Sequence, residues 1–359
     1  MPAFRIPVGY EDFDEIRQKG SYYVDKSGLI YDLVNGTTNK VSLFTRPRRF
    51  GKTLNMSMIQ SFFDITRDSH AAFDGLEVSR HEDFCRQWMN QRPVLFVSFK
   101  GVEGLSFDSA LDRMRTTLAN VCYRLSFLEK SDSVDKEGKI LFSRLRARGA
   151  SPEDLTSSLF ALTQMLEAHF GKKVVLLIDE YDVPLAKAYA RGYYEEMVGL
   201  VRGMFSSGLK TNEAVKFSVM TGCLRVSKES IFTGFNNPVV MGILNTEFAE
   251  CFGFTEREVE EMLKYYGLEE SGETVKDWYD GYLFGNTQIY CPWDVVNYVR
   301  RKVHDEKAQA ENYWVNTSGN EVLRRFVRET GMRRPYELER LIGWESVEKE
   351  IDENMTYRD

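Results

Sequence analysis

Cysteine and histidine are scarce in this chain of 359 residues, which has five cysteines and four histidines. No two cysteines have the C-x-x-C spacing of zinc sites or redox motifs, and the histidines form no cluster with ligand spacing. An odd number of cysteines without an export signal favours reduced thiols. These absences argue against zinc or disulfide chemistry and predict a cytoplasmic protein.

Long apolar segments are absent as well. No stretch approaches the roughly 18 uninterrupted apolar residues of a transmembrane helix, so no membrane partner is expected. Residues 1–5 lack the apolar core of a signal peptide. The formal net charge is −7, which gives no support to a surface that coats nucleic acid. Only a local basic patch could contact DNA.

The most informative segment runs from Ser42 to Thr53. It has the pattern of a buried strand, a tight loop with Gly51-Lys52-Thr53, and a helix. The free N–H groups of such a helix point at an anion. Lys52 can reach the β- and γ-phosphates of a nucleotide, and the Thr53 hydroxyl can hold Mg²⁺. We therefore predict that the loop binds ATP with Mg²⁺.

This loop departs from the usual G-x-x-x-x-G-K-[ST] pattern, because Arg46 occupies the position of the first glycine. Its four basic side chains suggest contacts with a triphosphate, with DNA contact as the alternative. The alternative for the whole segment is an ordinary strand–turn–helix connection with an exposed lysine. The predicted nucleotide-binding residues are Arg46, Arg48, Arg49, Phe50, Gly51, Lys52, Thr53 and Leu54.

A second motif is the apolar run of residues 174–178, which ends in Asp179 and Glu180. Such a run suggests a central parallel strand that is covered on both faces. Ligands of open α/β sheets bind beyond the carboxyl ends of the strands. We predict Asp179 as a Mg²⁺ ligand and Glu180 as the general base that activates water. The alternative is a solvated acidic turn after a core strand.

A third candidate site follows residues 215–221, another strand pattern that ends at Thr221. Thr221 could sense the γ-phosphate or position the attacking water. Arg225 could stabilise the charge of the transition state in its own subunit, or act on a neighbouring subunit of a homo-oligomer. The alternatives are a hydroxyl that satisfies backbone groups and a surface salt bridge.

The order of patterns predicts an α/β fold with a mainly parallel, doubly wound sheet. We expect an N-terminal arm over residues 1–40, a nucleotide-binding domain over residues 41–250, and a helical lid or partner-docking domain over residues 251–359. The arm should contain a short strand at 22–24 and a helix at 26–34. The polar segment 131–150 reads as a mobile connection. Expected strands are 41–45, 94–99, 174–178, 215–221 and 239–243, and expected helices include 57–63, 108–128, 155–170 and 194–209.

The C-terminal part has two recognisable features. Thr255 and Glu258 have the spacing of a capping box that opens a helix through Tyr266. An aromatic cluster over residues 278–284 suggests a helical core, with base stacking as the alternative. In the arm, Tyr23 could lie near an adenine, although a structural role is favoured.

Several motifs together resemble the AAA-ATPase-like family of bacterial and archaeal proteins. They are the segments at residues 5–9, 23–27, 45–53, 178–182, 221–228, 236–237 and 278–285. The resemblance covers nearly the whole chain, and its Arg-Pro-Arg-Arg-Phe-Gly-Lys-Thr loop accounts for the missing first glycine. It implies a P-loop NTPase three-layer sandwich. Members often continue into a PD-(D/E)XK nuclease-like domain, and we expect this chain to be truncated before it.

The leading hypothesis is a P-loop ATPase whose hydrolysis of ATP drives a conformational change, with Lys52, Glu180, Thr221 and Arg225 as catalytic residues. A second hypothesis is a nucleotide-dependent switch that holds ATP with little hydrolysis. A third is the ATPase part of a nucleic-acid-processing protein. The presence of both Asp179 and Glu180 after the strand at 174–178 favours the first hypothesis, an ATPase.

Overall fold

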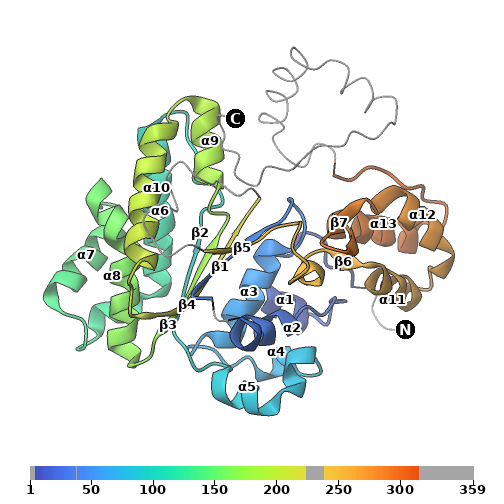
Figure 1. Ribbon diagram of the computed structural model, residues 1–359, viewed down its shortest axis with the longest axis horizontal. Coiled ribbons are helices and arrows are strands. Elements are labelled where there is room, and N and C mark those ends of the chain that lie inside the picture. Colours follow the sequence, from blue (N-terminus) through green and yellow to red (C-terminus); the bar gives the residue numbers. More distant parts are fainter. Residues whose placement is uncertain (1–4, 38, 224–237, 315–359) are drawn as a thin grey trace.

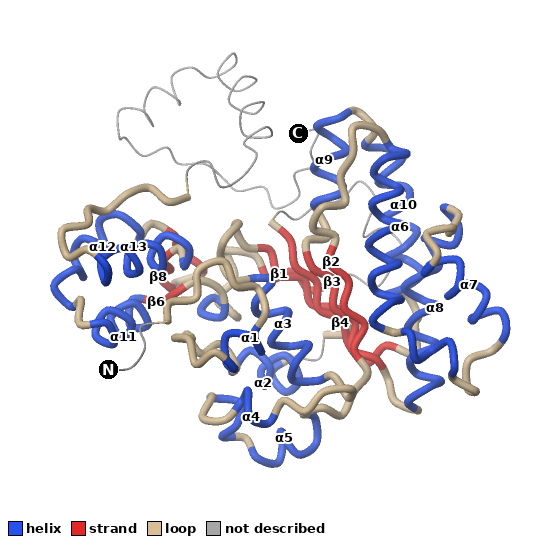
Figure 2. The backbone as a smooth tube through the Cα atoms, turned by 180° about the vertical axis from the view of Figure 1, so that it is seen from behind, coloured by secondary structure: helices blue, strands red, loops and turns tan. Residues whose placement is uncertain are grey.

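The computed structural model of this protein describes residues 5–37, 39–223 and 238–314. Arg225, Asn236, Asn237 and the C-terminal tail therefore lie outside the described residues. Figure 1 gives the element labels that are used below, and Figure 2 shows the chain from behind.

A five-stranded parallel sheet forms the centre of the molecule, with the strand order β2-β3-β4-β1-β5. All residues of β1 and β3 are buried, because these apolar runs lie between two layers of helices. The five expected strands are confirmed, each within two residues of its predicted ends. The strands are β1 (Val41–Thr45), β2 (Val94–Ser98), β3 (Val174–Asp179), β4 (Val215–Gly222) and β5 (Val239–Met241).

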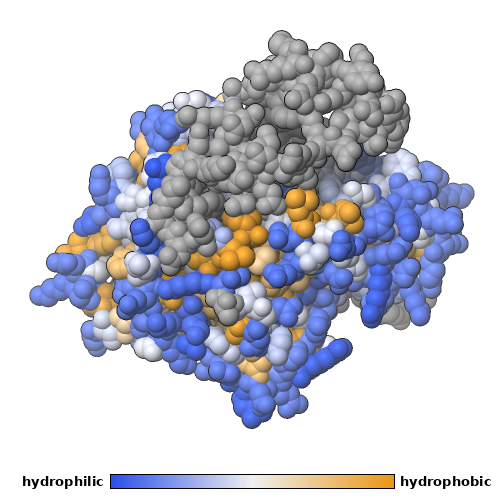
Figure 3. All heavy atoms as spheres, in the orientation of Figure 1, coloured by the Kyte–Doolittle hydropathy of each residue, from blue (hydrophilic) through white to orange (hydrophobic). Residues whose placement is uncertain are grey.

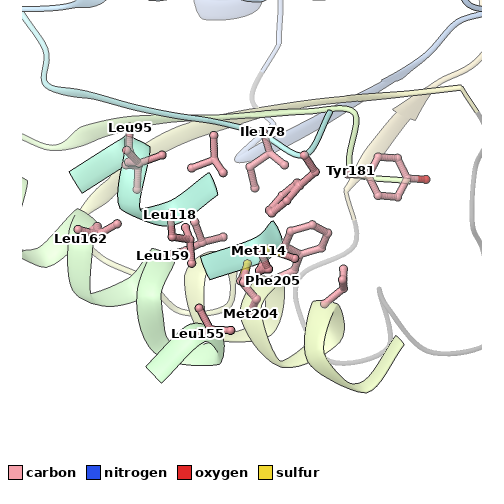
Figure 4. Packing of buried hydrophobic residues seen from close by; sticks show 14 of the residues in the cluster. Leu95, Met114, Leu118, Leu155, Leu159, Leu162, Ile178, Tyr181, Met204 and Phe205 are labelled. Atoms are coloured by element: carbon pink, nitrogen blue, oxygen red, sulfur yellow. The ribbon is translucent and has the colours of Figure 1, made fainter. Parts of the chain in front are cut away.

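Helices cover both faces of this sheet (Figure 2), which confirms the three-layer sandwich. One face packs on α6 (Phe107–Arg124), α8 (Pro152–Phe170) and α10 (Tyr194–Leu209). In this layer Ile178 of β3 faces Leu159 and Met204 of the helices (Figure 4). The other face packs on α1 (Phe13–Gln18), α3 (Lys52–Phe63) and α5 (Glu82–Trp88). The remaining short elements of these layers are α4 (His70–Phe73), α9 (Val183–Arg191) and 3-10 helices at Glu77–Arg80, Ser126–Lys130 and Ala249–Cys251.

The polar segment 131–150 contains a helix, so the expectation of a mobile connection is wrong. Helix α7 spans Lys136–Arg146, and the Asp135 carboxylate caps it by accepting from the Gly138 N–H at 2.6 Å. Phe142 and Leu145 are buried, while the other side of the helix is solvated. The segment reads as polar because only one stripe of this helix faces the core.

The N-terminal arm packs as short helices and extended chain. It contains α1, α2 (Gly28–Tyr31) and one π-helical turn (Asp32–Gly36). The expected strand at 22–24 does not form, because these residues have no strand partner and instead follow the wall of a cavity. The helix expected at 26–34 is present as α2 and the π-helical turn.

The C-terminal part forms a subdomain on one side of the sheet (Figure 1), and its helices agree with the expected helical character. Helix α11 begins at the capping box of Thr255 and Glu258, as predicted. A small antiparallel sheet, in the order β6-β8-β7, was not expected from the sequence. The elements are β6 (Phe254–Thr255), α11 (Glu256–Tyr266), a 3-10 helix (Glu269–Ser271), α12 (Gly272–Tyr279), β7 (Tyr282–Phe284), β8 (Thr287–Tyr290) and α13 (Pro292–His304).

Of the predicted aromatic cluster, Tyr279 and Phe284 are buried, whereas Trp278 is exposed. The face seen in Figure 3 is mostly hydrophilic, with hydrophobic residues gathered near its middle. Within the described ranges, no helix combines the length and apolar character that crossing a membrane requires.

Candidate functional site

The loop between β1 and α3 is the first part of the site. Gly51 has φ +79° and immediately precedes α3, so the chain turns sharply into the helix at a conformation that glycine adopts without cost. The first N–H groups of a helix have no partner within it, and the helix dipole makes this end partly positive. The loop thus presents Lys52, Thr53 and the start of a 12-residue helix together.

The side chain of Lys52 is buried within this loop. Its ammonium group donates to the backbone carbonyls of Arg46, at 3.0 Å, and Pro47, at 2.9 Å. The sulfur of Cys223, just beyond β4, lies 3.6 Å away. The loop therefore wraps around one fixed positive charge, which lies at the carboxyl end of β1.

Asp179 is the centre of a hydrogen-bonded cluster at the ends of three strands. Its carboxylate is fully buried and accepts from the hydroxyl groups of Thr53, at 2.9 Å, and Thr221, at 2.5 Å. The hydroxyl of Ser98 at the end of β2 lies 3.3 Å from the same carboxylate. Strand β4 lies between β1 and β3, so Thr221 bridges the loop side and the acidic side of the site.

Glu180 follows Asp179 in a strained conformation, with φ +53° for a residue that is not glycine. Its half-buried side chain lines the same cavity as Lys52, and within the described ranges its carboxylate makes no ion pair or hydrogen bond. Burial, assisted by the nearby charge of Asp179, raises the pKa of Glu180. Such a carboxylate is a stronger base than an ordinary glutamate.

A cavity of about 580 Å³ lies beside Lys52, Thr53 and Glu180, which are part of its lining. Its lining includes charged residues, among them Lys52, Glu180 and Lys100, and residues with apolar or aromatic side chains, among them Tyr22, Met262 and Tyr266. Three parts of the chain that are distant in sequence enclose it. The walls include residues 6–11 and 22–24 of the arm, residues 48–55 of the loop and α3, and residues 253–254, 262, 266, 292–293 and 296 of the C-terminal subdomain.

Arg46 does not share this cavity, contrary to the prediction that it binds phosphate. Its guanidinium is fully buried and donates to the carbonyls of Met241, at 2.6 Å, and Phe248, at 3.2 Å. It also lies over the rings of Phe252 and Phe284, and burial lowers its pKa to about 10. Arg46 therefore fixes the loop to the segment after β5, because its donors are directed into the core.

The other predicted loop residues do line the cavity. Arg48 and Arg49 are exposed, and neither forms an ion pair within the part of the chain that is described. Phe50 is buried, and Leu54 is half-buried at the start of α3. The structure thus brings together the predicted residues Arg48, Arg49, Phe50, Gly51, Lys52, Thr53, Leu54, Asp179, Glu180 and Thr221.

The residues around Asp179 can contribute to a magnesium site but cannot make one alone. The described ranges contain no group of three or more histidine, cysteine or acidic side chains that could hold a metal. The oxygen donors of Thr53 and Asp179 match the preference of Mg²⁺, which usually completes its shell with water and substrate phosphates. The buried Asp179 charge, which hydroxyl groups but no described cation contact, fits such an ion.

Comparison with known proteins agrees with this arrangement. A family model described as "Predicted AAA-ATPase" matches residues 7–232, which is more than half of the chain. The chain belongs to the AAA-ATPase-like family. A curated relative, the "Uncharacterized protein in vnfD 5'region" of Azotobacter chroococcum mcd 1, is 27% identical over 326 residues. The aligned region covers 88% of this chain and 55% of the relative, so the chain spans about half the length of that protein.

Ser98, Cys223 and Trp293 are among the residues of this AAA-ATPase-like site that the sequence did not predict. Ser98 ends an apolar run, and this is the same signal that identified Asp179 and Thr221. Cys223 lies in the family-like segment 221–228 but has no chemical signal of its own, and the segment around Trp293 has none either, because the contacts of both residues depend on the packing of distant segments. Trp293 also lies beyond residue 232, where the family match ends.

Proposed function

We propose that this protein binds ATP with Mg²⁺ and hydrolyses it. The observation that carries the proposal is that Lys52, Thr53 and Glu180 line one cavity, while the buried Asp179 behind them accepts from the Thr53 and Thr221 hydroxyl groups. A phosphate-binding loop alone would suit a nucleotide switch. Glu180, the carboxylate next to Asp179, adds the general base that hydrolysis requires.

In the binding step, the N-terminal end of α3 and the Lys52 ammonium hold the β- and γ-phosphates. Arg48 and Arg49 supply further positive charge at the rim of the cavity. Thr53 and Asp179 would hold Mg²⁺, which neutralises charge on the phosphates when it is bound. The apolar and aromatic side chains of the cavity wall are then available to the nucleoside.

In the chemical step, Glu180 accepts a proton from a water molecule as its oxygen bonds to the γ-phosphorus. The bond between that phosphorus and the bridging oxygen breaks, and ADP and phosphate leave. Thr221 keeps Asp179 in place and also accepts from the Glu180 N–H at 3.4 Å. Its proposed role is therefore to position both acids.

Arg225 is proposed from the sequence alone, as the residue that stabilises the charge of the transition state. An action on the neighbouring subunit would require a homo-oligomer, whose specific activity would rise with protein concentration. A cytoplasmic location remains part of the same proposal.

The test is ATP binding by calorimetry together with phosphate release, on the parent and two variants. Lys52→Ala should weaken ATP binding by more than about tenfold, because a charge-assisted contact of roughly 1.5–3 kcal/mol is lost. Glu180→Gln should retain binding and lower turnover by about 10²–10⁴-fold. Glu103→Gln, at an acid that lines the cavity but pairs with Lys187, is the matched control. Equal ATP affinity in Lys52→Ala, or unchanged phosphate release in Glu180→Gln, would contradict the proposal.

A further inference from the structure

Arg49 links the phosphate loop to the C-terminal subdomain. Its guanidinium carbon lies 4.2 Å from the ring centroid of Trp293, in the first turn of α13. The backbone of Arg49 has φ +71°, a conformation that residues other than glycine adopt at a cost in energy. Strained residues often occur at ligand sites and switches, where the surrounding structure holds them in place.

The neighbouring residue Phe50 anchors the same loop to the same subdomain. Its ring packs on Tyr282, at 4.8 Å, and Phe284, at 5.4 Å, while its carbonyl accepts from the Gly253 N–H at 3.3 Å. The anchor is apolar and buried. It holds the backbone beside Arg49 in place, so that the Arg49 side chain can change its partner without displacing the loop.

The charge of Arg49 is available to an anion. Its side chain is exposed and lines the cavity together with Trp293, and the described part of the chain offers it no acidic partner. A cation over an aromatic ring at an exposed site is held weakly. Bidentate hydrogen bonds from a guanidinium to phosphate are stronger and match its planar geometry. Phosphate would therefore displace the ring as the partner of Arg49.

We propose that Arg49 senses the terminal phosphates of the nucleotide by leaving Trp293 to bind them, and thereby reports occupancy to the C-terminal subdomain. This inference rests on the proposed nucleotide binding. Trp293 lies at the start of α13, and its indole N–H donates to the Tyr313 carbonyl at 3.1 Å. Release of Arg49 therefore changes a contact at the start of that helix. Any such coupling between the loop and the subdomain acts in both directions.

Tryptophan fluorescence tests this exchange, because removal of a cation from the face of an indole changes its emission. The chain has five tryptophans, so Trp293→Phe identifies the contribution of Trp293. Saturating ATP with Mg²⁺ should change the emission of the parent, whereas AMP, which lacks the terminal phosphates, should not. The change should be lost in Trp293→Phe and Arg49→Gln. It should persist in Lys216→Gln, which removes a cation from the face of another tryptophan, Trp88, outside the cavity lining.

Calorimetry on the same proteins separates this inference from the nucleotide site itself. Arg49→Gln should lower ATP affinity by roughly tenfold, as expected for the loss of a charged hydrogen bond, and leave AMP affinity unchanged. Arg49→Lys, which keeps the charge, should retain part of both signals, and circular dichroism checks that each variant is folded. ATP binding without a change in Trp293 emission, or a change that persists in Arg49→Gln, would overturn the role of Arg49 alone. An absence of ATP binding in the parent would overturn the nucleotide site and this inference together.

Discussion

The Thr221 hydroxyl donates to the Asp179 carboxylate across 2.5 Å, although the two residues are 42 positions apart in the sequence. They lie at the ends of the neighbouring parallel strands β4 and β3. Both are buried, so water cannot replace this bond. The bond fixes the orientation of the Asp179 carboxylate, which also accepts a hydrogen bond from the Thr53 hydroxyl of α3. Asp179 therefore links the phosphate loop to the carboxyl ends of β3 and β4.

Thr221→Val should disturb both stability and turnover. The variant keeps the shape of the side chain but leaves the buried Asp179 carboxylate one donor short, which costs about 1–3 kcal/mol. Chemical denaturation should show that loss in the free energy of unfolding. Phosphate release should slow, because Asp179 and Glu180 are less well positioned.

Thr221→Ser is the matched control, since it restores the hydroxyl and removes only a methyl group. It should recover most of the turnover of the parent. If Thr221→Val unfolds and hydrolyses ATP like the parent, the bond to Asp179 has no part in the site.

Arg46→Met should destabilise the fold strongly and should not act primarily on nucleotide binding. The variant fills the same space but removes the hydrogen bonds that the carbonyls of Met241 and Phe248 accept from the guanidinium, at a cost of about 1–3 kcal/mol. Arg48→Gln, at an exposed arginine two residues away, should change the free energy of unfolding by less than about 0.5 kcal/mol. A similar thermal midpoint for both variants would return Arg46 to the predicted role in phosphate binding.

The sheet was accessible from sequence because each strand is an apolar run with a polar end. Val41–Thr45 and Tyr194–Leu209 begin and end where their patterns predict. The parallel arrangement then places Asp179 and Thr221 at one edge without any knowledge of contacts. This reasoning identified all but Ser98 of the hydroxyl and carboxyl groups in the Asp179 cluster.

What could not be predicted depends on contacts between distant segments. Arg46 reads as a basic loop residue, and only the carbonyls 195 and 202 positions later make it a buried structural cation. The local pattern around Trp293 is that of an ordinary helix start, since nothing there indicates an arginine from the loop. Helix α7 escapes prediction for a different reason, because its narrow apolar stripe leaves the segment polar on average.

The pH dependence of hydrolysis should report the environment of Glu180. As a base it must be deprotonated, so the rate should fall when the pH is lowered through its pKa. Burial raises that pKa above the ordinary value of 4.5, so the acidic limb of single-turnover phosphate release should lie above pH 4.5. The folded state also binds this proton more tightly than the unfolded chain, so the contribution of Glu180 to stability falls as the pH rises. If the acidic limb of the pH–rate profile lies at or below pH 4.5, a group other than Glu180 is the base.

Glu180→Gly should stabilise the protein while it abolishes turnover. The left-handed conformation costs a residue other than glycine about 1–2 kcal/mol, and glycine relieves most of it despite its greater freedom in the unfolded chain. The variant also removes a desolvated carboxylate. Its free energy of unfolding at pH 8 should therefore rise by about 1 kcal/mol. Glu180→Ala also removes the base but keeps the strained backbone. If Glu180→Gly is no more stable than Glu180→Ala, this explanation is wrong.

The N-terminal arm contacts the C-terminal subdomain through Lys26, which lines the cavity. The Lys26 ammonium lies 2.6 Å from the Glu258 carboxylate and donates to the Glu250 carbonyl at 2.6 Å. Glu258 also belongs to the capping box of α11. The two side chains are only 9% and 21% exposed, so the pair is shielded from solvent and salt.

Lys26→Met should therefore lower the free energy of unfolding by about 1–3 kcal/mol and speed nucleotide release, because the arm and the subdomain separate more easily. Stopped-flow displacement of a fluorescent ATP analogue measures the release. Lys276→Met is the matched control, since Lys276 of α12 pairs with Glu256, which is on α11 like Glu258, but these two side chains are 53% and 48% exposed. That variant should change stability by less than about 0.5 kcal/mol and leave release unaltered. Equal release rates in the parent and Lys26→Met would mean that the arm does not retain the nucleotide.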